Sequence, residues 1–160
     1  MLARSVSWLC LLLIATIPPV VAAEPLPRGN CAQPLPRTDL AHCDFSRRKL
    51  AGRDLQGVRL AGAKLESADL RKANLNGADL SRSNAKWALF TGASLKGADL
   101  HDADLFHAIF DEADLSGARL VGAYLFGANL IDARAAKADF TGAYLKDVLM
   151  EGIDLSGGSI

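Results

Sequence analysis

From residue 40 to residue 160, every fifth position of the chain is apolar. Of these 25 positions, 21 are leucine or phenylalanine. The exceptions are Ala85, Ala135, Met150 and Ile160. Two residues before each of these positions lies a second column, which is alanine at every site from Ala63 to Ala143 except Ser83. We call the first set the centre residues and the second set the small-residue column.

A period of five residues fits neither of the regular elements. Five residues turn an α-helix by about 500°, so successive centre residues would move around the helix axis by about 140°. Along a flat strand, five is an odd number, so successive centre residues would point to opposite faces. The pattern therefore predicts a chain that changes direction every five residues and returns each centre residue to one shared core. Glycine, which suits such corners, recurs at the second position after many centre residues, as at Gly52, Gly77 and Gly142.

The repeat resembles the pentapeptide-repeat family, whose motif is A(D/N)LXX. Copies of this motif are Ala68-Asp69-Leu70, Ala73-Asn74-Leu75, Ala78-Asp79-Leu80, Ala98-Asp99-Leu100, Ala103-Asp104-Leu105, Ala113-Asp114-Leu115 and Ala128-Asn129-Leu130. The resemblance covers about residues 38–160 without a shift of phase. It implies an all-β fold, a right-handed quadrilateral parallel β-helix with four repeats in each coil. Twenty-five repeats then make about six coils, and about 4.8 Å between stacked strands gives a length of about 30 Å.

The first 23 residues have the features of a secretory signal peptide. Arg4 precedes a short apolar run, and Ala22-Ala23 supplies the small residues that signal peptidase accepts. An uncleaved membrane anchor is the alternative, but a span needs about 20 apolar residues, and this run is shorter and contains Pro18-Pro19. The residues before Cys10 do not fit a lipoprotein signal. We therefore expect cleavage after Ala23, a secreted or periplasmic protein, and no membrane span in the mature chain.

After cleavage two cysteines remain, Cys31 and Cys43. In an oxidising compartment such a pair is typical of a disulfide, whereas a redox or metal role would need a CxxC motif or further ligands. Residues 24–37 contain four prolines and so cannot form the interior of a helix. We expect them to form an extended N-terminal cap, with Leu26 or Leu35 over the lumen. Because Cys43 lies in the small-residue column, a bond to Cys31 would join this cap to the first coil.

The charges of the chain are balanced, with 18 lysines and arginines against 18 aspartates and glutamates. Loss of residues 1–23 removes only Arg4, leaving a net charge of −1. Such a chain has no strong field to attract nucleic acid or an anionic membrane. Some members of the family mimic duplex DNA and bind type II topoisomerases, but DNA carries about one charge per 1.7 Å, which requires a strongly acidic mimic. A topoisomerase modulator is therefore the least favoured function, and we expect no nucleic-acid partner.

A coil of twenty residues would divide the outward side chains among four faces. One face, centred on positions 45, 65, 85, 105, 125 and 145, receives all the aromatic residues of the mature chain that lie outside the core. These five residues, which we call the aromatic face, are Trp87, Phe106, Tyr124, Phe126 and Tyr144. Phe106 and Phe126 lie one coil apart, as do Tyr124 and Tyr144, so we expect each pair to stack. The rings are either a ladder that stabilises neighbouring coils or a contact surface, and both interpretations stay open.

The sequence contains no GxSxG, HExxH, P-loop or dinucleotide-binding motif. We therefore expect the protein to have no enzymatic activity and to bind no cofactor. Two histidines and two aspartates, His101, Asp102, Asp104 and His107, could together bind a divalent metal. Their spacing matches no metal signature, and aspartate before leucine is ordinary in this repeat, so we expect no metal site. His42 is expected to be a surface residue.

The leading interpretation is a non-catalytic exported scaffold that mediates protein–protein interaction through the aromatic face. Its partner would be another protein or a second copy of the chain in a homo-oligomer. The alternative is a carbohydrate or cell-envelope binding module, since tryptophan and tyrosine rings stack on sugar rings.

Overall fold

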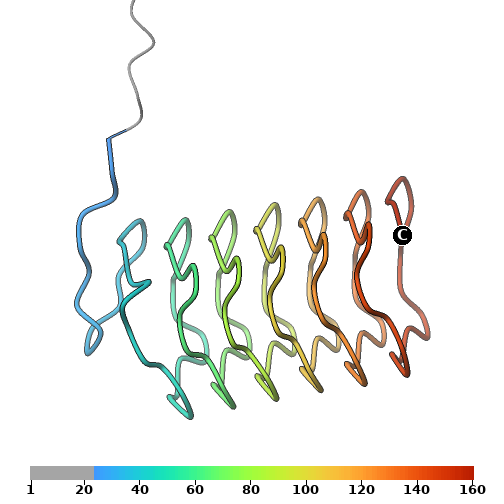
Figure 1. The fold of residues 1–160 in the computed structure, drawn as a ribbon, viewed down its shortest axis with the longest axis horizontal. Coiled ribbons are helices and arrows are strands. Elements are labelled where there is room, and N and C mark those ends of the chain that lie inside the picture. The colour runs from blue at the N-terminus through green and yellow to red at the C-terminus, as the bar shows by residue number, and fades with distance from the viewer. Residues whose placement is uncertain (1–23) are drawn as a thin grey trace, which may run out of the picture.

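The computed structural model describes residues 24–160, and the expected signal peptide, residues 1–23, lies outside the described residues. The chain winds into a stack of coils along one axis (Figure 1). Parallel β-bridges join residues twenty positions apart, from Asp39 with Arg59 to Asp139 with Ser159. The chain therefore returns beside itself every twenty residues. Residues 24–160 contain no α-helix and no strand longer than a single bridged residue, and thus no helix long and apolar enough to cross a membrane.

Backbone hydrogen bonds connect each coil to the next in a regular pattern. The N–H of a centre residue donates to the carbonyl nineteen positions later, as from Leu70 to Leu89 at 2.8 Å. The residue at that later position donates back across the same gap, from Leu89 to the carbonyl of Ala68 at 2.9 Å. This alternation is the pattern of a parallel sheet, in which evenly spaced bonds link neighbouring strands. Each coil is thus bonded to both of its neighbours, although no single strand is long.

Every repeat turns at the two residues that follow its centre residue. The N–H of the third residue donates to the carbonyl of the centre residue, as from Ala73 to Leu70 at 3.1 Å, which closes a β-turn. The second turn residue has φ between 52° and 69° at every corner from Arg37 to Gly157 except His42. This is the left-handed region that a type II turn requires and that glycine adopts most easily. The predicted role of glycine at the corners is confirmed, although twelve of the left-handed corners hold other residues.

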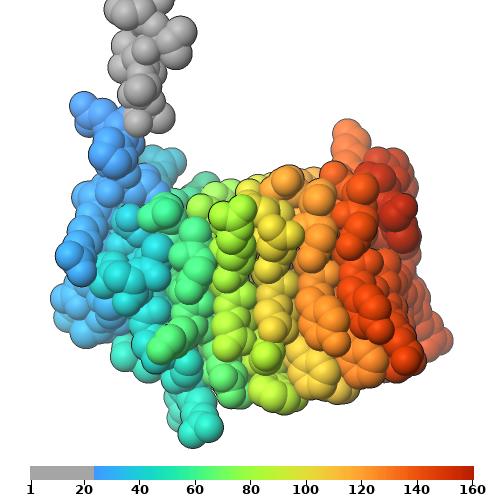
Figure 2. All heavy atoms as spheres, in the orientation of Figure 1, coloured from blue at the N-terminus to red at the C-terminus, as the bar shows by residue number. Residues whose placement is uncertain are grey.

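The centre residues and the small-residue column form one continuous buried core. Every centre residue from Leu40 to Phe140 is at most 3% exposed. The small-residue column is equally buried from Val58 to Ala138. The predicted convergence of every fifth residue on one interior is therefore confirmed. Figure 2 shows side chains of successive coils in contact along the length of the stack.

Residues 24–37 lie against the first coil, at the end of the stack opposite the C-terminus (Figure 1). The N–H of Gly29 donates to the carbonyl of Asp39 at 2.9 Å, next to a parallel bridge between Arg28 and Asp39. A Cβ atom at Gly29 would lie only 2.5 Å from Cδ2 of Leu40. The segment therefore passes in close contact with the first centre residue, where a side chain at position 29 would not fit.

The expectation that Leu26 or Leu35 covers the lumen is wrong. Leu26 is 37% exposed and Leu35 is 61% exposed, whereas Pro34 is buried. A turn closed by a 3.1 Å hydrogen bond from Gln33 N–H to the carbonyl of Asn30 precedes the proline and directs the chain inward. Proline has no N–H that would need a partner, so its ring can be buried without leaving a backbone donor unpaired.

Candidate binding face

The five rings of the aromatic face form one contiguous cluster. Phe106 and Phe126 stack with ring centroids 5.6 Å apart and planes 8° apart. Tyr124 and Tyr144 stack with centroids 5.1 Å apart and planes 11° apart. Trp87 meets Phe106 edge to face, with centroids 5.4 Å apart. The stacking that the sequence predicted for both pairs is present in the structure.

Further contacts join the two stacked pairs into a single surface. The rings of Phe106 and Tyr124 lie 6.4 Å apart, those of Tyr124 and Phe126 6.5 Å apart, and those of Phe126 and Tyr144 6.3 Å apart. These separations fall within the range of about 4.5–7 Å over which aromatic rings attract one another. The cluster therefore runs along the axis of the stack from coil to coil.

The position of each residue in its repeat places these rings together. Tyr124 and Tyr144 each directly precede a centre residue, and a parallel bridge joins them to each other. Phe106 and Phe126 each occupy the first corner position, and Trp87 occupies a second corner position with φ of 53°. Because the coils repeat every twenty residues, residues twenty positions apart lie side by side in successive coils. Trp87, Tyr124 and Tyr144 are 45%, 41% and 45% exposed, while both phenylalanines are half-buried.

Polar and charged groups border the rings. The Nζ atom of Lys146 lies 5.9 Å from the centroid of the Phe126 ring, a cation–π distance. The imidazole of His107 meets Phe106 edge to face, with centroids 4.3 Å apart. Nζ of Lys86 lies 3.1 Å from a carboxylate oxygen of Asp104. The arrangement is an apolar centre with a polar rim, as in many protein interfaces, and residues 24–160 contain no pocket.

The four residues weighed as a divalent-metal site have separate partners. Nδ1 of His101 lies 2.9 Å from Oδ1 of Asp99, which is outside the predicted set. Nδ1 of His107 lies 3.1 Å from the carbonyl of Gly127. Asp102 lies 3.8 Å from Nε of Arg82. The structure therefore does not bring these four side chains together around one point.

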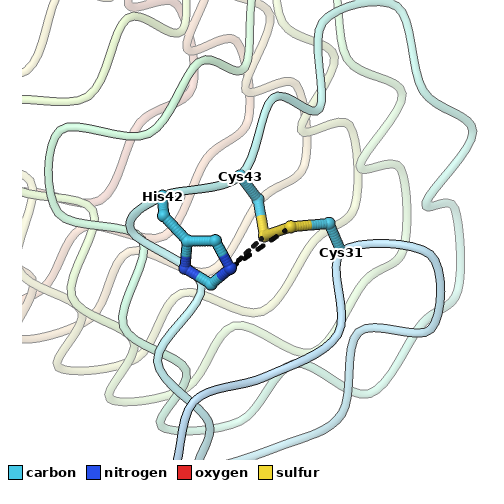
Figure 3. A group of neighbouring side chains, drawn as sticks. All are labelled: Cys31, His42 and Cys43. Carbon is cyan, nitrogen blue, oxygen red and sulfur yellow. Dashed lines mark hydrogen bonds between the residues drawn. A yellow bond between two sulfur atoms is a disulfide. The ribbon is translucent and has the colours of Figure 1, made fainter.

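A different cluster lies where residues 24–37 meet the first coil (Figure 3). Cys31 and Cys43 are joined by a disulfide with their Cα atoms 5.5 Å apart. Nε2 of His42 lies 3.5 Å from Sγ of Cys31 and 3.7 Å from Sγ of Cys43. The Nε–H of Arg28 donates to the same Nε2 at 3.4 Å. We call Cys31, His42 and Cys43 the cap cluster.

Sequence reasoning identified the two cysteines of the cap cluster but not its histidine. His42 is exposed, as expected of a surface residue, yet its ring lies over the disulfide. The available signal was the adjacency of His42 and Cys43. On its own that signal is weak, because adjacent residues in an extended chain point to opposite sides.

Comparison with protein-family models matches pentapeptide repeats, in eight copies, over residues 43–88, 86–122 and 118–157. Comparison with curated protein sequences finds no match. Among solved structures, the chain is similar to HetL, a pentapeptide repeat protein involved in heterocyst differentiation regulation from Nostoc sp. strain PCC 7120. The identity is 33% over 74% of this chain and 66% of HetL, with a TM-score of 0.36.

Two further solved structures are similar to this chain. A pentapeptide repeat protein from the thylakoid lumen of Arabidopsis thaliana is 31% identical over 68% of this chain and 65% of its own, with a TM-score of 0.30. A trypsin-treated variant of QnrB1, a plasmid-mediated fluoroquinolone resistance protein, is 20% identical over 76% of this chain and 63% of its own, with a TM-score of 0.46. The chain thus spans somewhat less than two thirds of the length of QnrB1 and just under two thirds of that of HetL.

Proposed function

Because the chain belongs to the pentapeptide-repeat family, we propose that it is a non-catalytic scaffold that binds another protein through its aromatic face. The observation that carries this proposal is the contiguous cluster of five rings, three of them more than 40% exposed. An apolar patch of this kind is typical of an interaction surface, and tyrosine and tryptophan are enriched in protein interfaces. The partner is a different protein or a second copy of this chain.

The family forms right-handed β-helices, and we propose that this one is quadrilateral with about six coils. Four successive bridges, starting at Asp39, Asp44, Lys49 and Asp54, precede the return of the chain to the first side, which supports four sides. Residues 24–37 act as the N-terminal cap, supported by the disulfide and by the burial of Pro34. The disulfide also supports export to an oxidising compartment, secreted or periplasmic, after removal of residues 1–23.

A role as a DNA mimic has less support, because arginines interrupt the aspartates along one side of the stack. Nη1 of Arg59 bonds to Oδ2 of Asp39 at 2.9 Å. Three coils further along the same side, Nη1 of Arg119 bonds to Oδ1 of Asp99 at 3.2 Å. These pairs neutralise the aspartates that an acidic column would need.

Photo-crosslinking tests the proposed interaction surface. A benzophenone-bearing residue in place of Tyr144 should form an adduct in cells, because that side chain would lie in the interface. Arg134 is the matched control, since it holds the same position in its repeat on another side and is exposed. An adduct of twice the chain mass identifies a second copy, and any other mass identifies a different protein. Adducts at both positions, or at neither, contradict the proposal.

A charged substitution separates an interface from a purely structural ladder. Phe126→Glu should abolish the Tyr144 adduct, while Ala136→Glu, at the same corner position on another side, should preserve it. Thermal unfolding checks that the coil stays folded, and Tyr124→Glu, at a more exposed position, provides a second disrupting variant. If the variants lower the melting temperature but leave the adduct intact, the rings serve stability alone.

Trp87 favours carbohydrate binding as a second candidate function. Its ring contacts the other rings of the cluster edge to face at Phe106, and the residue is 45% exposed, so a sugar ring can reach it. In a Trp8→Phe background, Trp87 is the only tryptophan, and its fluorescence should change on titration with cell-envelope polysaccharides. An unchanged spectrum across a panel of polysaccharides excludes this candidate.

A further inference from the structure

The cap cluster brings together three side chains of the kinds that bind zinc. The two sulfur atoms and the Nε2 atom of His42 all lie within 4.8 Å of one another. Figure 3 shows the imidazole edge directed at both sulfurs. Thiolate sulfur and imidazole nitrogen are the ligands that Zn²⁺ prefers in proteins, and three protein ligands with one open position form a recognised class of zinc site.

The distances from the imidazole to the sulfurs suit a tetrahedral ion. With Zn–S of about 2.3 Å and Zn–N of about 2.0–2.1 Å, tetrahedral ligands place nitrogen about 3.6 Å from each sulfur. Nε2 of His42 lies 3.5 Å from Sγ of Cys31 and 3.7 Å from Sγ of Cys43. The imidazole therefore already stands where a zinc ligand would stand. Of the three ligand atoms, only the two sulfurs must move, separating to about 3.8 Å once they are no longer bonded.

The backbone at His42 is a second and independent observation. Between Arg37 and Gly157, His42 is the one second-corner residue without a positive φ. At the other corners the side chain is attached to a residue with left-handed backbone conformation. The side chain of His42 is attached to a backbone of different conformation. The first coil therefore departs from the repeat at the residue whose ring meets the disulfide.

We propose that the reduced form of this protein binds one Zn²⁺ ion through Sγ of Cys31, Sγ of Cys43 and Nε2 of His42, with water as the fourth ligand. The disulfide first accepts two electrons and two protons from an external dithiol, which is itself oxidised to a disulfide. The two thiols then release two protons as their thiolates coordinate the ion. The segment of residues 24–37 is joined to the first coil by the disulfide in one state and by the metal in the other.

Arg28 opposes metal binding in this site. Its Nε–H donates to the Nε2 atom that the ion needs, and its positive charge repels a divalent cation. Its side chain is exposed and can swing away. We expect Arg28→Ala to bind the ion more tightly than the unaltered chain.

Cobalt is the probe for this site, because thiolate-bound Co²⁺ absorbs light and Zn²⁺ displaces it. The full chain carries Cys10→Ser, so that Cys31 and Cys43 are its only thiols, and is reduced with a phosphine. Titration with Co²⁺ should produce sulfur-to-cobalt charge-transfer absorption that saturates at one ion per chain and disappears on addition of Zn²⁺. X-ray absorption of the zinc form should show two sulfur ligands at about 2.3 Å and nitrogen or oxygen at about 2.0–2.1 Å.

Variants and the redox state provide the controls. His42→Ala should weaken Zn²⁺ binding at least as much as the roughly 10- to 100-fold loss caused by altering the outer shell of a metal site. His107→Ala, a histidine at a distant corner, should bind as the unaltered chain does, and the oxidised protein should give no charge-transfer absorption. Circular dichroism confirms that the reduced protein keeps its fold. Absence of the absorption in the folded reduced chain, or unchanged affinity in His42→Ala, would overturn the proposal.

Discussion

Phe90 and Phe110 stack face to face inside the coil, with ring centroids 4.7 Å apart and planes 3° apart. Both are centre residues, twenty positions apart, and neither is exposed. Their stacking repeats in the interior the arrangement that Phe106 and Phe126 show on the outside. Ring-to-ring packing between successive coils therefore occurs both in the core and on the outer surface, on neighbouring sides of the coil.

Truncation of Phe110 to alanine should be severely destabilising. The change removes the stacked ring and leaves a cavity in the buried core, which the surrounding side chains can fill only in part. We therefore expect the unfolding free energy to fall by about 3–5 kcal/mol. Urea unfolding measures it. Phe110→Leu is the control, because leucine fills most centre positions, and its cost should stay below about 1.5 kcal/mol. A loss below about 1 kcal/mol in the alanine variant would contradict a tightly packed core.

Ser83 is the one polar residue in the small-residue column between Ala63 and Ala143, and its hydroxyl is buried without a hydrogen-bond partner in residues 24–160. A buried unsatisfied hydroxyl costs about 1–3 kcal/mol. Ser83→Ala should therefore stabilise the protein by about 1 kcal/mol, measured as a higher urea midpoint with an unchanged slope. A lower midpoint would show that the hydroxyl has a partner, such as water.

Gly142 should resist replacement for reasons of backbone conformation alone. Its φ is +68°, and a Cβ atom there would meet no atom within 4 Å. Gly142→Ala should therefore cost the left-handed strain of about 1–2 kcal/mol, reduced by the smaller entropy of the unfolded chain. Lys137→Gly makes the reverse change at the preceding corner, where φ is 59°, and should leave thermal stability equal or higher. Equal melting temperatures for Gly142→Ala and the unaltered chain would contradict this account.

Asp111 should lower stability at neutral pH. Burial, and then the nearby charges of Glu112 and Asp132, raise the pKa of this carboxyl, and its Oδ1 is buried without a partner in the part of the chain described. A raised pKa in the folded state means that the charged form is disfavoured there, so stability falls as pH rises through that pKa. Asp111→Asn should raise the melting temperature at pH 7, and the gain should vanish below about pH 4, where both forms are neutral.

Asp154 is the matched control, because its pKa is shifted in the opposite direction from that of Asp111. Hydrogen bonds from the backbone N–H and side chain of Ser156 hold the pKa of this carboxyl below its usual value. Its charge therefore favours the folded state above the unfolded pKa of about 3.9, and that contribution is lost as pH falls through the folded pKa. Asp154→Asn should lower the melting temperature at pH 7 and leave it unchanged at low pH. Shifts of the same sign in both variants would contradict the assignment.

The sequence was sufficient to predict the repeat, the buried core and the stacked pairs of the aromatic face. This was possible because phase never slips between Leu40 and Ile160, so one periodic argument applies to every repeat. Which side chain of residues 24–37 is buried was not predicted correctly, because this segment has no period. A single local turn decides there that Pro34 is buried and Leu35 exposed.

The contact of His42 with the disulfide was not predicted, for a related reason. A periodic argument assigns His42 the left-handed backbone of every other corner, and the structure departs from that average at this residue. The binding role of the aromatic face stays a prediction, since ring contacts within one chain are the same whether or not a partner covers them.

Because bridges join residues i and i+20, only insertions or deletions of whole coils, twenty residues each, keep every side chain on its own side of the stack. Insertion of a single pentad would keep the corners and the core in phase but advance every later residue by one side of the coil. A pentad inserted after residue 110 would carry Phe126 and Tyr144 away from Phe106 and so divide the row of rings between two walls. Evolution by duplication can therefore extend the tower without disturbing its outer surfaces only in steps of four pentads.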